Sequence, residues 1–142
     1  MDYEEKVEFL KSYQYLKNKI QSLIREREFY QNQRIKYAGS IIQQPSSQIN
    51  KKGGISFVVA TLDEIEYNLS NEIKRVTKEL NNVFNTIEGV ENTNYRSILM
   101  YRYVNDYTFE EIADRLPYNS KQYVCELHEK IINSMTMTNH DM

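Results

Sequence analysis

The sequence contains few residues that cross-link or interrupt a chain. Its one cysteine, Cys125, excludes an internal disulfide, which agrees with a reducing compartment. No apolar run reaches the roughly 18 residues of a membrane-spanning helix, so we expect no membrane partner. The start, MDYEEKVEF, is acidic where a signal peptide would be basic. These absences predict a cytoplasmic protein.

Catalytic and metal-binding groups are scarce as well. Cys125 and His128 lie on one turn, but a structural zinc needs about four nitrogen or sulfur ligands, and His140 falls in an expected tail. We therefore interpret Cys125 and His128 as ordinary helix residues. The Gly53-Gly54 pair lacks the spacing and the Lys-Ser/Thr of a phosphate-binding loop. Without a nucleophile–base set, the sequence predicts no enzyme, no metal, no cofactor and no small-molecule substrate.

Glycine and proline are also rare, and they divide the chain. Four of these six residues fall within 39–56, a stretch without sustained periodicity that predicts a flexible loop. Gly89 and Pro117 mark two later breaks. We expect two long helices in residues 1–90, a separate domain in 91–137 and a tail in 138–142.

The two long helices each carry an apolar stripe. The first should run from about Asp2 to Ala38, with a coiled-coil spacing that becomes polar toward its end. Its stripe consists of Phe9, Tyr13, Leu16, Ile20, Leu23, Arg27, Tyr30, Arg34 and Tyr37. The second should begin at Ser56 or Thr61, where Thr61 and Glu64 match a capping box, and end near Ile87. Its stripe consists of Leu62, Ile65, Leu69, Ile73, Val76, Leu80, Val83 and Ile87.

Each stripe must be buried against another helix. A helix of about 36 residues is about 54 Å long, and a domain of fewer than 50 residues offers little surface to cover it. We therefore favour a homodimer formed through these helices. An antiparallel hairpin within one chain satisfies the same pattern and remains the alternative.

Three shorter helices are expected in the last third. The first spans about Asn94 to Val104 with Ile98, Leu99 and Tyr103 facing inward, and Asn105-Asp106 makes a turn. The second begins at Thr108, where Thr108 and Glu111 match a capping box, and runs to Leu116, before Pro117. The third begins at Asn119 or Ser120, both good N-caps, and continues to about Met135. The fold class is therefore all-α: a coiled-coil-like helical hairpin followed by a three-helix domain.

The last two of these helices match a helix-turn-helix. Ala113 provides the small residue that a steep helix crossing needs, and the expected core comprises Ile112, Ala113, Leu116, Val124 and Leu127. The third helix would then offer its first turns to a major groove, which is wide enough for one helix. The residues expected to face DNA are Ser120, Lys121, Gln122, Tyr123 and Glu126. Lys121 suits phosphate or guanine, Gln122 suits adenine and Glu126 can accept from cytosine.

The charge balance weighs against this interpretation. The net charge is −2, and residues 94–142 carry five Lys/Arg against seven Asp/Glu. DNA-binding proteins usually present a basic patch. Any DNA contact must therefore come from a local face.

The same segment resembles sigma factor region 4, and more closely the ArpU/RinA-type phage late transcription regulators. The resemblance covers about 45 residues and is carried by Arg96, Leu99, Arg102, Tyr103, Thr108, Glu111, Ile112, Ala113, Leu116, Ser120, Val124, Leu127, His128, Lys130, Ile131 and Ile132. It implies a phage or prophage activator of late genes that works with host RNA polymerase. It also implies DNA contacts by Lys121 and Gln122, with Tyr123 and Glu126 at neighbouring positions.

Two functions thus remain open. The first is a dimeric transcription regulator that binds promoter DNA through a sigma-like helix-turn-helix. The second is an interaction protein that binds RNA polymerase or another regulator with little affinity for DNA, and the acidic balance fits it better.

Overall fold

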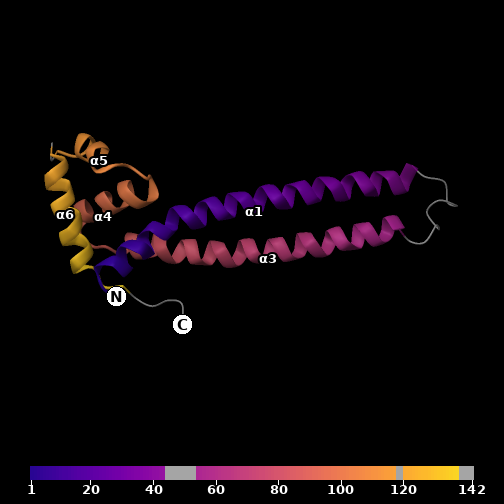
Figure 1. Cartoon of the computed structure of the whole chain (residues 1–142), viewed down its shortest axis with the longest axis horizontal. Coiled ribbons are helices and arrows are strands. Elements are labelled where there is room, and N and C mark those ends of the chain that lie inside the picture. The colour runs from indigo at the N-terminus through magenta and orange to yellow at the C-terminus, as the bar shows by residue number, and fades with distance from the viewer. Residues whose placement is uncertain (44–53, 118–119, 138–142) are drawn as a thin grey trace. The chain divides into compact units, whose positions relative to one another are not determined.

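The computed structural model describes residues 1–43, 54–117 and 120–137, and every regular element in these ranges is helical. The prediction of an all-α chain that begins with long helices is confirmed. The elements are α1 (Tyr3–Gln43), α3 (Gly54–Glu88), α4 (Thr93–Leu99), a π-helical turn η1 (Met100–Val104), α5 (Phe109–Arg115) and α6 (Lys121–Ser134) (Figure 1). Among the described helices, none is long and apolar enough to cross a membrane.

The chain divides into two compact units. Residues 1–18 and 78–142 form one, here called the core unit, and residues 19–77 form the other, here called the hairpin unit. The long helices α1 and α3 therefore each contribute to both units.

In the hairpin unit, α1 and α3 lie side by side and antiparallel (Figure 1). Arg27 donates to the Ser70 hydroxyl at 3.4 Å. About two turns later on α1, Arg34 donates to Glu66 at 3.4 Å. Residue numbers rise on one helix as they fall on the other. The helices thus pair within one chain, which is the alternative that the sequence left open, and the homodimer remains a prediction.

Both long helices extend into the stretch that was expected to be a loop. Helix α1 continues through Gly39 to Gln43, and α3 begins at Gly54, before both predicted starts; residues 44–53 lie outside the described ranges. The capping box predicted at Thr61 is wrong, because Thr61 lies inside α3 and its hydroxyl donates to the Phe57 carbonyl at 2.9 Å. The half-buried Val58 and Val59 continue the apolar face before Thr61, so packing extends the helix past a local start signal.

The core unit contains most of the buried side chains. They come from every helix of the unit and are Leu10, Leu16, Val83, Ile87, Ile98, Leu99, Tyr103, Ile112, Ala113, Val124, His128, Ile131, Ile132 and Met135. Polar contacts also attach the start of α1: Lys6 Nζ donates to the Ile132 carbonyl at 3.3 Å. The first turns of the chain thus complete a core that is otherwise built from the C-terminal helices.

Candidate nucleic-acid interface

Local sequence signals determine both ends of α5. The Thr108 hydroxyl accepts from the Glu111 amide at 3.1 Å, and the Glu111 carboxylate accepts from the Thr108 amide at 3.1 Å. This reciprocal capping box satisfies two amide groups that the first helical turn leaves without partners, as predicted. The helix ends at Arg115, and Leu116 is already extended before Pro117.

Helix α6 begins at one of the two positions that the sequence allowed. The Ser120 hydroxyl accepts from the Tyr123 amide at 3.3 Å and caps the helix, whereas Asn119 lies outside the described residues. The helix continues to Ser134, with Met135 as its C-cap.

The five residues expected to fill the core between α5 and α6 are not equally enclosed. Ile112, Ala113 and Val124 are buried, whereas Leu116 and Leu127 are half-buried. The apolar face of α6 is completed instead by Ile131 and Ile132 and by one polar side chain, His128.

All five predicted DNA-facing residues are exposed at the start of α6: Ser120, Lys121, Gln122, Tyr123 and Glu126. Two of them already have acidic partners. Lys121 Nζ lies 3.5 Å from a Glu110 carboxylate oxygen of α5, and Gln122 Nε2 donates to Glu126 at 3.4 Å. A ligand that binds Lys121 or Gln122 must therefore compete with a carboxylate.

The nearby arginines have packing roles. The Arg102 guanidinium lies 4.1 Å from the centre of the Phe109 ring and also donates to the Tyr107 carbonyl at 3.0 Å. Arg115 lies 4.4 Å from the centre of the Tyr107 ring. Such cation–π contacts stabilise the junction between η1 and α5, but they keep two cations close to aromatic faces.

Tyr103 of η1 and His128 of α6 form a buried polar pair that was not predicted from the sequence. His128 is 5% exposed, and its Nε2 lies 2.6 Å from the Tyr103 hydroxyl. Burial, with a smaller contribution from the Arg102 charge, lowers the pKa of His128 to about 4, so the imidazole is neutral near pH 7. Burial also raises the pKa of the Tyr103 phenol. The signal was available: His128 lies four residues after Val124 and three before Ile131, on the buried face.

The start of α1 supports the same region. Gln14 Nε2 donates to the carbonyls of Tyr103 and Val104 at 3.0 and 2.8 Å, where η1 ends. After η1, Asp106 adopts φ 60°, and the Tyr107 amide donates to the Tyr101 carbonyl at 2.9 Å. The turn predicted at Asn105-Asp106 thus reverses the chain toward α5.

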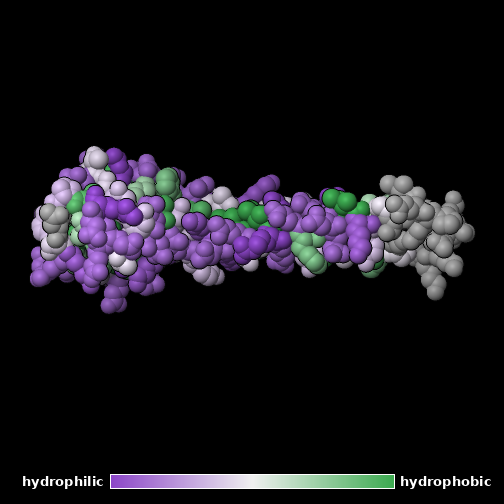
Figure 2. All heavy atoms as spheres, turned by 90° about the horizontal axis from the view of Figure 1, so that it is seen from above, coloured by the Kyte–Doolittle hydropathy of each residue, from purple (hydrophilic) through white to green (hydrophobic). Residues whose placement is uncertain are grey.

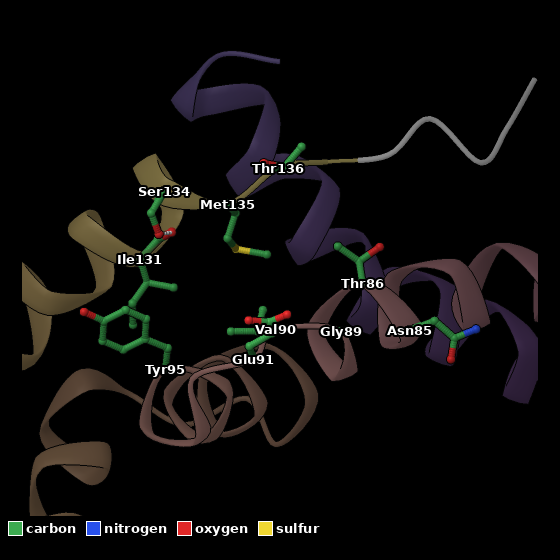
Figure 3. A pocket seen from close by; sticks show the side chains of 10 residues that line it. All are labelled: Asn85, Thr86, Gly89, Val90, Glu91, Tyr95, Ile131, Ser134, Met135 and Thr136. Carbon is green, nitrogen blue, oxygen red and sulfur yellow. Dashed lines mark hydrogen bonds between the residues drawn. The ribbon is translucent and has the colours of Figure 1, made fainter.

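A cavity of about 610 Å³ lies elsewhere in the core unit, between the end of α3, α4 and the end of α6 (Figure 3). The Thr86 and Ser134 hydroxyls on its wall donate to the carbonyls of Asn82 and Ile131. The charged residue among its lining side chains is Glu91. Asn85, Tyr95 and Thr136 contribute the other polar side chains of its wall. Within the described residues, no group of three or more metal-ligating side chains occurs either.

Comparison with known proteins gives a family. Neither the curated proteins nor the solved structures contain a significant match. The family model described as protein of unknown function (DUF1492) matches residues 41–134, which is more than half of the sequence. The chain therefore belongs to the DUF1492 family.

Proposed function

We propose that the protein is a transcription regulator that binds double-stranded promoter DNA through α6. The observation that carries the proposal is the arrangement of α5 and α6. Both helices are capped, α6 begins at Lys121 shortly after α5 ends at Arg115, and the first turns of α6 present a polar, exposed face. In a helix-turn-helix, these are the turns that enter the major groove.

The resemblance to sigma factor region 4 and to ArpU/RinA-type regulators supports a more specific role. On that resemblance, the protein is a phage or prophage activator of late genes that acts in the bacterial cytoplasm together with host RNA polymerase. Two copies would act together, because one recognition helix with acidic neighbours makes few favourable contacts.

Each polar residue has a defined part in this proposal. Ser120 and Lys121 contact phosphate or guanine, and Gln122 reads adenine through its amide, which both donates and accepts. Tyr123, which is 47% exposed, lies beside them. Glu126 can accept from the cytosine amino group, although it repels a phosphate at the same position.

The alternative function is an interaction protein that binds polymerase or another regulator. The pairing of Lys121 with Glu110 and the stacking of Arg102 and Arg115 on aromatic rings favour it, because they reduce the cationic surface available to DNA.

Gel shifts with the DNA upstream of the chain's own gene, and with unrelated DNA, distinguish the two functions. Lys121→Ala combined with Gln122→Ala should weaken specific binding about tenfold to a hundredfold, since one good side-chain-to-base pair contributes about 1–3 kcal/mol. Lys130→Ala removes one charge from an exposed residue later in α6 and should have a smaller effect. A double variant that binds like the wild type would exclude direct readout by α6.

Glu110→Gln provides a test in the opposite direction. It removes the ion-pair partner of Lys121 and one negative charge near the DNA, so affinity should rise about twofold to fivefold, as expected for an exposed ion pair. The gain should shrink at high salt. If the wild-type chain and Glu110→Gln both fail to bind any DNA at low salt, the interaction-protein function is the correct one.

A further inference from the structure

The cavity of the core unit has an apolar floor. Its wall combines two segments, 85–95 and 131–136, that lie far apart in the sequence. Ile131 and Met135 of this wall are buried, and Val90 and Tyr95 are half-buried. Figure 3 shows Met135 and Val90 pointing toward the middle of the cavity from different sides. Hydrophilic side chains, by contrast, predominate on the face of the core unit seen in Figure 2. The floor therefore suits a ligand with an apolar body.

Three polar side chains of the wall are committed to accepting hydrogen bonds. The Thr86 hydroxyl donates its proton to the Asn82 carbonyl at 2.7 Å. The Ser134 hydroxyl donates its proton to the Ile131 carbonyl at 2.8 Å. Each hydroxyl can therefore only accept from a ligand, and the Glu91 carboxylate likewise only accepts. A ligand that satisfies these groups must be a hydrogen-bond donor.

The charge of the wall indicates which kind of donor fits. Helices α3 and α6 both end beside the cavity without a basic residue in their last turn, and helix C-termini carry partial negative charge. Lys6 and Arg96 offset part of this charge. They donate to the carbonyls of Ile132 and Val90, both at 3.3 Å, but neither side chain lines the cavity. The Glu91 carboxylate is thus the group that favours a positively charged ligand.

We infer that the cavity binds a small molecule that combines a primary ammonium group with an apolar body. The ammonium group has three N–H donors for the carboxylate and the hydroxyl oxygens of the wall. The apolar body covers Ile131 and Met135, and the Tyr95 ring adds an aromatic surface that attracts a cation. A volume of about 610 Å³ is typical of small-molecule sites. The inference is independent of DNA binding, because no DNA-facing residue lines the cavity.

Three ligands of similar size test the charge preference in NMR titrations of the full chain. Phenethylamine carries an ammonium group, phenethyl alcohol a neutral hydroxyl and phenylacetate a carboxylate, each beside the same ring. The amine should bind in the millimolar range, as expected for so small a molecule, and about tenfold more tightly than the other two. The amides of residues 89–91 and of Met135 should shift, whereas those at the start of α6 should not.

The two control ligands make the test decisive. Asn85 and Thr136 also line the cavity, and both are exposed and can donate to an alcohol or a carboxylate. Binding of either control ligand as tightly as the amine would therefore overturn the inference. So would an amine that fails to bind, or one that shifts amides elsewhere in the chain instead.

Glu91→Gln keeps the shape of the side chain and removes its charge. It should weaken binding of the amine about fivefold and leave binding of the alcohol unchanged. Glu88→Gln is the matched control, because it removes the same charge from an exposed residue at the end of α3 that does not line the cavity. The control should stay within about twofold of the wild type, and neither change at an exposed residue should unfold the chain. Wild-type affinity in Glu91→Gln, or an equal loss in both variants, would overturn the inference.

Discussion

The core unit and the hairpin unit are built from the same two long helices, yet their interiors differ. In the core unit, side chains from six helical elements bury one another, and Leu10, Ile98, Ile112 and Ile131 are fully enclosed. Among the described residues of the hairpin unit, Leu62 and Val76 are the buried side chains. An apolar heptad spacing therefore produces a core only where further helices cover it.

The polar contacts of the two units differ in the same way. In the hairpin unit, Lys19–Glu72 and Arg34–Asp63 are partly exposed ion pairs, which typically contribute little to stability. In the core unit, the Tyr103–His128 hydrogen bond is buried, and loss of one partner leaves the other without a partner. We thus expect the core unit to determine the free energy of unfolding of the single chain.

The largest effect should come from the core. Ile112→Ala removes a fully buried side chain and should lower the free energy of unfolding by about 2–5 kcal/mol. Ile73→Ala, the same change at a half-buried residue of α3, should cost about 1 kcal/mol. Urea denaturation at low protein concentration measures both; equal losses would contradict the distinction between the units.

The second largest effect should come from acid, which should lower the stability of the core unit. The folded-state pKa of His128, about 4, lies below the usual value near 6.5, so protons bind more readily to the unfolded chain. Stability should therefore be constant above pH 6.5 and fall by roughly 2–3 kcal/mol as the pH decreases toward 4. The hairpin unit contains no histidine.

Urea denaturation at several pH values, compared with His128→Gln, isolates this effect. The variant keeps an amide able to bond Tyr103 but does not titrate, so its stability should change less between pH 6.5 and 4. Parallel pH profiles for the two proteins would assign the acid sensitivity to other groups.

The smallest effect should come from Gln14→Ala. The change leaves two half-buried carbonyls at the end of η1 without their side-chain donor, at a cost of about 1–3 kcal/mol. Gln21→Ala, an exposed position on the same helix within the hairpin unit, should change stability by less than about 0.5 kcal/mol. A matching loss in both variants would mean that helix propensity, and not the contact to η1, is responsible.

Local signals predicted the elements that depend on neighbouring residues. Thr108 with Glu111 and Ser120 mark helix starts through contacts within one turn, and the spacing of Ile98, Leu99 and Val124 identified buried faces. Features that depend on distant residues were missed. Gln14 reaches η1 across 89 residues, and the Tyr103–His128 pair joins η1 to α6. Periodicity also could not decide whether the long helices pair within or between chains, because both arrangements bury the same stripe.

The division of α1 between two units has a consequence for chain entropy. The chain leaves the core unit at Asn18 and returns at Lys78, so completing the core closes a loop of about sixty residues. A flexible loop of that length costs roughly 3–4 kcal/mol to close. The antiparallel pairing of α1 with α3 holds the two ends of this loop together, so a hairpin that is already paired reduces this cost. A hairpin that lacks a core of its own can thus still determine how fast the other unit folds.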